Sequence, residues 1–371
     1  MPVMRPNVLE ISAGNLLHNL QLARTRMPGS RVMAAIKANA YGHGSALVAQ
    51  ILAEGGVEGF AVASLGEAME LTRQHPQLPP CTVLAGPFAP EEIPLAAAAG
   101  HRLVLHCWEQ IGWLAEARWQ QPLALFLKLD SGMHRLGFAA EELPRLLDQL
   151  TQKSGGPLRI LGFLSHLARA DTPGDSYNAQ QISLFWQSVQ QYGALTEGQH
   201  SLPNSAAILA LPQSQSPWIR PGLMLYGLSP LPGRSATSLG LRAVAQWWSK
   251  IIAIRRLAPG EWLGYGAAWQ AERPSRIGII ACGYGDGLTR QLGLLGAPVW
   301  IGQQQSRLLG RVSMDLAFVD LTEISGVRVG DRVLLAGGSD LPLEDWAEAL
   351  GTIPYEVGTR ITQRVPRRRV P

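Results

Sequence analysis

Short apolar or β-branched runs alternate with helix-like segments along the first two thirds of the chain, and this alternation is the strongest constraint on the fold. The strand-like runs lie at residues 32–37, 59–64, 81–85, 102–106, 123–129, 159–166, 200–204 and 223–227. Apolar residues recur at helical spacing from Ser45 to the Gly55-Gly56 pair, over 141–150 and over 178–192. Eight strand-like runs separated by helices predict an α/β chain folded as a (β/α)8 barrel.

A doubly wound parallel sheet is the competing α/β arrangement. A G-x-G-x-x-G pattern between a strand and a helix would favour it, and the sequence has none in that position. The glycine-rich piece 283–287 lies outside the alternating region and precedes no helical pattern.

The pattern changes at a Pro/Gly/Ser-rich connector near residues 230–240. After it, short β-like runs separated by turns lie at 249–256, 276–282, 298–302, 307–312, 316–321 and 332–336. Helical signal is sparse there, and residues 343–350 give the clearest piece. We therefore expect a barrel domain over residues 1–233 and a mostly-β domain over residues 234–371.

Composition excludes several classes of function. The net charge of +4 is small for 371 residues, and no basic stripe with interleaved aromatics suggests nucleic acid. The dense run Arg367–Arg369 is expected to be a solvated tail. Three scattered cysteines without CxxC spacing argue against a disulfide framework and against a zinc site, so no metal is expected. With neither a signal-peptide pattern nor an apolar stretch of membrane-spanning length, we expect a cytoplasmic protein without membrane contact.

One lysine ends the first apolar run. Lys37 is followed by Tyr41, Gly42 and Gly44 in the stretch AAIKANAYGHG. Because burial disfavours the charged amine, a lysine at the mouth of a buried strand can become a nucleophile for Schiff-base chemistry. The competing interpretation is a lysine that extends from the strand end into solvent.

Polar residues also stand at the ends of other predicted strands. They are Lys128, Asp130, His166, Asn204 and Ser205, with Arg220 just before the last predicted strand. In a barrel, reactive groups project from the carboxyl ends of the strands, so these residues are predicted to share one mouth. Asn204-Ser205 and the segment 219–223 fit a phosphate site, although an ordinary Pro-Gly turn explains the second equally well.

Several long motifs occur in an order that resembles the bacterial alanine racemases. They are AAIKANAYGHG (34–44), KLDSGMHRLGF (128–138), SHLARAD (165–171), NSAA (204–207), IRPGLMLYG (219–227), GYGAAW (264–269), GYGDG (283–287), GRVSMD (310–315), IPYEV (353–357) and RVPR (364–367). The resemblance covers nearly the whole chain. It implies a pyridoxal 5′-phosphate (PLP) enzyme with a barrel followed by a β domain.

The resemblance also implies roles for individual residues. Lys37 resembles the lysine that carries PLP, Arg220 the partner of the pyridine nitrogen, and Arg135 the residue that meets the phenolic oxygen and the substrate carboxylate. The phosphate cradle corresponds to Tyr41, Ser205, Gly222, Leu223 and Tyr355, with Gly222 and Leu223 acting through backbone N–H groups. Lys128 corresponds to a lysine that is often carbamylated in the family.

A second set of residues corresponds to groups that reach the site from the other subunit. Tyr265 resembles the second catalytic base, with His166 as its hydrogen-bonding neighbour, and Met314 resembles a residue whose N–H meets the substrate carboxylate. The resemblance therefore implies a head-to-tail homodimer. The narrow entry corresponds to Asp171, Tyr284, Arg290, Arg311 and Tyr355. The sequence departs from the family pattern at Ser313, Pro203 and Gly358. The last two are expected to loosen or shift the Tyr355 loop and the contacts that hold the phosphate.

The predicted function is PLP-dependent interconversion of L-alanine and D-alanine by two bases, Lys37 and the partner subunit's Tyr265. It would supply D-alanine for peptidoglycan or serve alanine catabolism. A broad-specificity amino-acid racemase of the same fold is the main alternative. A decarboxylase would not need Tyr265 as a base, and a non-catalytic PLP-carrying barrel would lack the second domain.

Overall fold

The computed structural model describes residues 5–152, 154–338 and 341–371, which form two compact units. The barrel unit contains Leu16–Ala40 and Ser45–Leu241. The β unit contains the described residues up to Asn15, together with Tyr41–Gly44 and Arg242–Pro371. The expected division at residues 233 and 234 stays a prediction.

Eight parallel strands close into a barrel, which confirms the predicted fold class. They are β2 (Arg31–Ala35), β3 (Gly59–Val62), β4 (Cys81–Val83), β5 (Arg102–Leu105), β6 (Leu123–Lys128), β7 (Leu158–Leu164), β8 (Ser201–Asn204) and β9 (Trp218–Arg220). The barrel closes where β9 pairs with β2. Strands buried on both faces read as continuous apolar runs, which is why the sequence located most of them: Val32, Met33 and Ala34 of β2 are fully buried.

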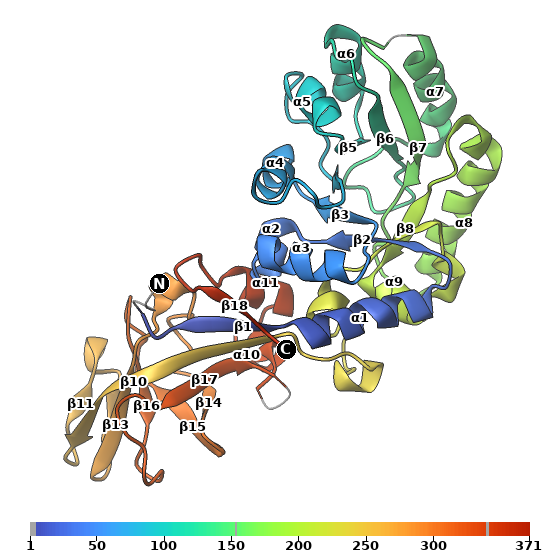
Figure 1. The fold of residues 1–371 in the computed structure, drawn as a ribbon. Helices are drawn as coiled ribbons and strands as arrows, with labels where there is room; N and C mark the ends of the chain where they lie inside the picture. Colours follow the sequence, from blue (N-terminus) through green and yellow to red (C-terminus); the bar gives the residue numbers. More distant parts are fainter. Residues whose placement is uncertain (1–4, 153, 339–340) are drawn as a thin grey trace. The chain divides into compact units, whose positions relative to one another are not determined.

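Helices follow most of the strands. They are α3 (Ser45–Glu54), α4 (Leu65–Gln74), α5 (Glu92–Ala98), α6 (Trp108–Glu116), α7 (Leu143–Gln152), α8 (Ser176–Tyr192) and the short α9 (Ser205–Ala210), while α1 (Ala13–Arg26) precedes β2. Helices α6, α7 and α8 lie outside strands β6 and β7 (Figure 1). The predicted helices at 45–54, 141–150 and 178–192 match α3, α7 and α8 to within two residues at each end.

The prediction of a last barrel strand at 223–227 is wrong. The strand that closes the barrel is β9, and Leu223–Tyr226 form a 3-10 turn. All four residues of the turn are buried, so their apolar run carried no period that could distinguish a strand from a turn. Pro221 lacks an N–H and stands between strand and turn. Arg220 is consequently the last residue of the last strand.

An eight-stranded sheet forms the body of the β unit, in the order β13-β16-β15-β14-β17-β10-β1-β18. The strands are β1 (Val8–Ser12), β10 (Ala245–Leu257), β13 (Ser275–Ile280), β14 (Pro298–Ile301), β15 (Gln304–Leu309), β16 (Ala317–Asp320), β17 (Arg332–Gly337) and β18 (Arg367–Val370). Strands β13 and β10 also pair. The unit further contains the hairpin β11 (Trp262–Leu263) and β12 (Trp269–Gln270) and the helices α10 (Leu343–Ala349) and α11 (Pro354–Thr359).

The C-terminal basic run is an ordered strand and not a tail, although Arg368 and Arg369 are exposed to solvent as their charge suggested. Residues Arg367–Val370 form β18, which pairs in parallel with β1. Arg368 forms an ion pair with Glu10, and Arg367 donates hydrogen bonds to the carbonyls of Gly42, Thr362 and Val365. Glu10 and Gly42 lie more than 300 residues away in the sequence, so the local charge pattern could not reveal them. Among the described residues, no helix has both the length and the apolar character needed to cross a bilayer.

Candidate active site

Six of the predicted site residues lie at the carboxyl ends of barrel strands. Lys128 and Arg220 are the last residues of β6 and β9, and Lys37 and His166 follow β2 and β7 by two residues. Ser205 follows β8, and Arg135 lies in the loop after β6. Because parallel strands end at the same rim of the barrel, the structure brings these groups together at one mouth.

A left-handed turn carries Lys37. Ala38, Asn39, Ala40 and Tyr41 have φ between 51° and 54°, a conformation that costs an L-residue other than glycine roughly 1–2 kcal/mol. The Ala40 N–H donates to the Ile36 carbonyl at 2.8 Å. Asn39 Oδ1 accepts the Ser45 N–H at 2.9 Å. Strained backbone persists only where its surroundings fix it, and it clusters at functional sites.

The Lys37 amine lies in an environment that favours its neutral form. Burial lowers its pKa, the Arg135 and Arg220 guanidinium groups lower it further, and the Glu67 carboxylate opposes them. A lowered pKa increases the fraction of amine that carries a lone pair at neutral pH, which is the form that attacks a carbonyl. Lys37 is half-buried, and its environment is compatible with the nucleophile interpretation, which stays a prediction.

Lys128 is a buried cation without a carboxylate partner among the described residues. Its Nζ lies 3.4 Å from the Leu129 carbonyl oxygen. The nearby Asp130 carboxylate accepts the N–H groups of Gly132 and His134, both at 3.0 Å. Burial, followed by the charge of Arg220, lowers the pKa of Lys128 to about 7. Lys128 is thus poised between its charged and neutral forms near neutral pH.

This lowered pKa predicts a pH-dependent stability. Between pH 7 and 10.5 the unfolded chain keeps a proton on Lys128 that the folded chain releases. Stability therefore rises with pH across this window, by up to about 1.4 kcal/mol per pH unit from this one group. Lys128→Met removes that dependence. The free energy of unfolding of Lys128→Met, taken relative to that of the wild type, should therefore fall as the pH rises. Urea unfolding in CO2-free buffer at pH 7 and 9.5, at fixed chain concentration, measures it; a difference that stays constant with pH would contradict the assignment.

Arg220 is buried and fixed by several acceptors. Its guanidinium donates to Ser201 Oγ, to the Ser165 carbonyl and, at 3.2 Å, to the Leu202 carbonyl. It also lies 3.4 Å from His166 Nδ1. A guanidinium can only donate, so His166 Nδ1 accepts and the ring proton is on Nε2. Burial and the charge of Arg220 hold the pKa of His166 well below its usual range, and the imidazole is neutral.

Ser205 joins two turns that fit a phosphate group. Its Oγ accepts the N–H of Gly222 at 2.8 Å and that of Met224 at 3.3 Å. A hydroxyl has one donor and two acceptor positions, so these bonds leave the Ser205 proton for an anion. The first N–H groups of a 3-10 turn have no partner within the turn, and Leu223 begins one here. The donor set fits a phosphate, with the difference that Gly222 N–H is engaged by Ser205.

The two predicted tyrosines of the phosphate cradle lie in the β unit. The rings of Tyr41 and Tyr355 are 5.7 Å apart between centroids. Burial raises the pKa of Tyr41, so its hydroxyl stays protonated and can donate a hydrogen bond. Gly358 permits a close approach: a Cβ on Gly358 would lie 2.8 Å from the Tyr41 carbonyl oxygen, and one on Gly42 only 1.9 Å from the Gly358 oxygen. The expected loosening of the Tyr355 loop stays a prediction.

Tyr265 and Met314 are exposed residues of the β unit, with 68% and 53% of their surface accessible. Tyr265 lies in the turn between β11 and β12, next to the left-handed glycines Gly264 and Gly266. The carbonyl of Met314 accepts the Gly285 N–H at 2.9 Å. Of the residues predicted to line the entry, Tyr284, Arg290, Arg311 and Tyr355 belong to the β unit and Asp171 to the barrel unit. The structure thus places the two predicted bases, Lys37 and Tyr265, in different units.

Sequence reasoning missed two carboxylates that support the site loops. Asp286 is fully buried and pairs with Arg5 at 3.0 Å and with Arg364 at 3.5 Å. Asp286 also accepts the Gly283 N–H. Two residues later, the Gly285 N–H donates to the Met314 carbonyl, so Asp286 supports the segment that contacts Met314. Glu67 accepts the N–H of Ala38, the residue after Lys37, and the N–H of Ala63, the residue after β3. The spacing Ser64-x-x-Glu67 is a helix-start signal that could have located Glu67, although it carries no hint of a role at the mouth.

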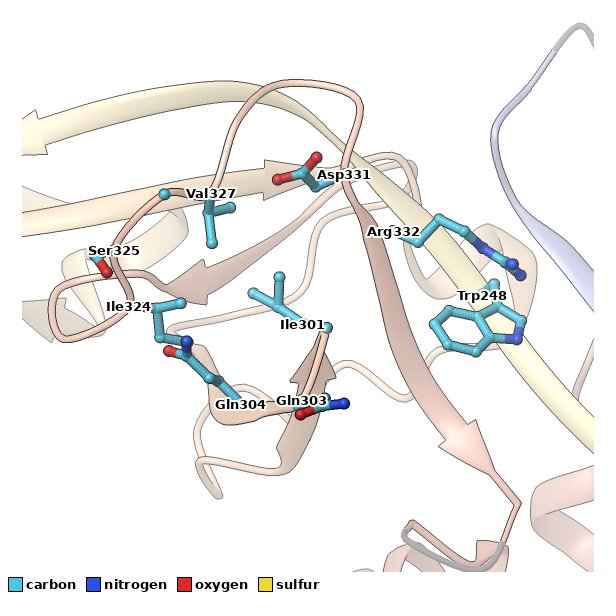
Figure 2. Close-up of a pocket in the computed structure, with 11 residues that line it drawn as sticks. Trp248, Ile301, Gln303, Gln304, Ile324, Ser325, Val327, Asp331 and Arg332 are labelled. Atoms are coloured by element: carbon cyan, nitrogen blue, oxygen red, sulfur yellow. The ribbon is translucent and has the colours of Figure 1, made fainter.

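The β unit also has a concave region of about 570 Å³, shown in Figure 2. Trp248, Ile301, Ile324, Asp331 and Arg332 are among its lining residues. Its charged groups are engaged within the unit. The Arg332 guanidinium carbon lies 4.1 Å from the centre of the Trp248 ring, and the Arg332 side chain pairs with Glu10 at 2.7 Å. None of the predicted site residues lines this region.

Comparison with known proteins gives agreement along the whole chain. Residues 11–230 match the family model of the alanine racemase N-terminal domain, and residues 244–369 match that of the C-terminal domain. The alanine racemase of Acidithiobacillus ferrooxidans is 50% identical over 366 residues, which are 99% of each chain.

Solved structures agree with the sequence comparison. The biosynthetic alanine racemase from Pseudomonas aeruginosa superposes with a TM-score of 0.87 at 40% identity, covering 99% of this chain and 100% of that one. An alanine racemase from Bartonella henselae with covalently bound pyridoxal phosphate superposes with a TM-score of 0.84 at 27% identity, covering 98% of this chain and 99% of that one.

Proposed function

The chain belongs to the alanine racemase family, and we propose that it interconverts L-alanine and D-alanine with PLP, using Lys37 and the partner subunit's Tyr265 as the two bases. The observation that carries this proposal is the lysine itself. Lys37 lies at the barrel mouth on a left-handed turn, with its pKa lowered by burial and by two arginines. The barrel rim that carries it also carries the Ser205 and Leu223 donors.

The residues of the mouth fit the charges of PLP. The cofactor has a phosphate, a phenolic oxygen and an aldehyde, and the mouth offers anion donors at Ser205 and Leu223, a guanidinium at Arg135 and an amine at Lys37. The Arg220 guanidinium donates to neutral acceptors only, and it lies near Arg135, so the negative charge of a bound cofactor would be favourable at this mouth. When bound, PLP supplies the electron-withdrawing ring that makes an amino-acid Cα proton easier to remove.

Racemisation requires proton transfer on both faces of the Cα atom. Lys37 takes or returns the proton on one face, and a second base must act on the other. Tyr265 is the candidate, and its exposure within its own chain fits a residue that completes the site of a second copy. Met314, similarly exposed, would offer its N–H to the substrate carboxylate there. We therefore propose a head-to-tail homodimer in which each site is built from both chains.

Arg220 would face the ring nitrogen of the cofactor. Since a guanidinium keeps its proton, Arg220 offers a hydrogen bond and no proton transfer. Its acceptors, Ser201, Ser165 and Leu202, hold it at the end of β9 and limit its movement. A ring that is not protonated withdraws electrons less strongly, which favours simple return of the proton over side reactions.

Lys128 is proposed to react with CO2 to form a carbamate, with loss of a proton. The neutral amine is the reacting form, and a pKa of about 7 makes it abundant at neutral pH. The carbamate would place a negative charge beside Arg135 and so orient that guanidinium toward the substrate carboxylate. A carbamate signal in ¹³C NMR with ¹³C-bicarbonate is expected in the wild type and absent in Lys128→Met. Its presence in the variant would place the modification elsewhere.

The direct test of the function is chiral product analysis. The purified chain with PLP is incubated with L-alanine, L-serine or L-lysine, and the enantiomers are separated and quantified. We expect D-alanine to form much faster than D-serine or D-lysine. Comparable rates would support the broad-specificity racemase, and absence of D-alanine would remove the proposed activity. The biological role we propose is supply of D-alanine for peptidoglycan, with alanine catabolism as the alternative.

A further inference from the structure

Glu67 joins two strand ends at the barrel mouth. It is the third residue of α4 and is half-buried. One carboxylate oxygen accepts the Ala38 N–H at 2.8 Å, and the other accepts the Ala63 N–H at 2.7 Å. Ala38 is the residue after Lys37, and Ala63 is the residue after β3. A single carboxylate thus bridges the Lys37 turn to the neighbouring strand.

The left-handed turn needs such an anchor. Ala38 and Ala40 adopt φ values of 51° and 54° without the local side-chain bonds that let asparagine tolerate this region. Hydrogen bonds from backbone N–H groups to a carboxylate are about twice as strong as neutral ones. The bond to Ala38 acts on the peptide that directly follows the Lys37 Cα, so it fixes the direction in which the lysine side chain leaves the chain.

Glu67 also differs in charge from the other groups around Lys37. Arg135, in the loop after β6, and Arg220, at the end of β9, both act on the Lys37 amine and favour its neutral form. Lys128 and His166 complete the cluster from β6 and from the loop after β7. The Glu67 carboxylate, from α4, favours the ammonium form instead. It therefore limits how far the cationic cluster can deprotonate the lysine before the cofactor arrives.

We propose that Glu67 is a positioning residue for Lys37, which locks the left-handed turn against the end of β3 and supplies negative charge beside the amine. This inference rests on the proposed role of Lys37 as the cofactor lysine. It adds a residue on α4 whose carboxylate acts through the backbone beside Lys37. Glu67→Asp keeps the charge and shortens the bridge, so it isolates the bridge. Glu67→Gln removes the charge and also replaces one of the two acceptor oxygens by an NH2 donor, so the charge is read from the labelling profile by comparison with Glu67→Asp.

The test uses the full-length chain prepared without cofactor. The rate at which an amine-specific reagent labels Lys37 is followed across pH by peptide mass spectrometry, and hydrogen exchange is followed over the peptide that contains residues 37–41. In Glu67→Gln the labelling profile should move to lower pH, so that labelling below the Lys37 pKa becomes about threefold faster or more. In Glu67→Asp the profile should stay close to wild type, while exchange at the turn becomes about tenfold faster.

Glu70→Gln is the matched control. Glu70 lies on the same helix, pairs with Arg73 at the surface, and should leave both the profile and the exchange unchanged. An unchanged profile in Glu67→Gln, or a shift to higher pH, would overturn the charge role. Wild-type exchange in Glu67→Asp would overturn the bridge. Thermal unfolding shows whether Glu67→Gln or Glu67→Asp has lost its fold. If one of them has, the conclusion is drawn from the other.

These readouts involve neither PLP nor alanine. A chain that racemises no alanine but shows the expected Glu67 effects would refute the proposed function and leave this inference intact. A chain that racemises alanine normally, but shows no effect of the Glu67 variants on labelling or exchange, would refute this inference and leave the proposed function intact.

Discussion

Replacing Lys37 by alanine is expected to abolish both covalent attachment of the cofactor and racemisation. The variant loses the amine that attacks the cofactor aldehyde and, with it, one of the two bases. General acid–base groups alone contribute about 10²- to 10⁴-fold, and the variant also loses the covalent attachment of the cofactor, so activity should fall by about 10⁴-fold or more. The left-handed turn has its non-helical residues at 38–41, after Lys37, so the variant is expected to keep its fold.

The measurement is the visible absorbance of the protein after exhaustive dialysis, together with D-alanine formation. Lys250→Ala is the control, because Lys250 is an exposed residue of β10 in the β unit. It should retain the cofactor band and full activity. A band that survives dialysis in Lys37→Ala would show that another of the four lysines carries the cofactor.

Replacing Tyr265 by phenylalanine is expected to preserve cofactor binding and to lower racemisation in both directions by about 10²- to 10⁴-fold, the usual contribution of a general base. The substitution removes only the hydroxyl from a side chain that is 68% exposed, so stability should change little. Lys37 remains and still serves its own face of the Cα atom. One enantiomer of alanine should therefore continue to exchange its Cα proton with D2O without inversion.

Proton NMR in D2O follows this exchange, and chiral chromatography follows the inversion. Tyr192→Phe, at the end of α8, is the control and should behave as wild type. Turnover near the wild-type value in both directions would contradict the role of Tyr265 as a base. Loss of exchange in both enantiomers would show that Tyr265 acts on both faces, which the two-base scheme does not allow.

The sequence predicted the barrel because buried parallel strands are apolar along their whole length. The same property explains the one strand it misplaced: the buried run 223–226 reads as a strand, while β9 is only three residues long and ends in a charged residue, Arg220. Strands β1 and β18 of the β unit pair with each other across more than 350 residues of sequence. No local pattern at Arg367–Arg369 could reveal that pairing, because charge predicts solvent unless the distant partner Glu10 is known.

The candidate site was predicted residue by residue from its motifs and from its position at strand ends. What the sequence could not supply is the backbone that aims these residues. Ala38 and Ala40 are strong helix formers, and nothing in their chemistry predicts a left-handed turn. The anchor for that turn, Glu67, lies on another helix and contacts it only in the folded chain. The burial that gives Lys128 a pKa of about 7 is likewise a property of the assembled barrel.

Mixing the two inactive variants tests the central claim most directly. If each site combines Lys37 of one chain with Tyr265 of the other, a dimer of one Lys37→Ala chain and one Tyr265→Phe chain contains one intact site and one site that lacks both bases. Random assortment after co-expression should then restore roughly a quarter of the wild-type rate of D-alanine formation. A mixture that stays at the sum of the two single variants would contradict an active site shared between two copies of this chain.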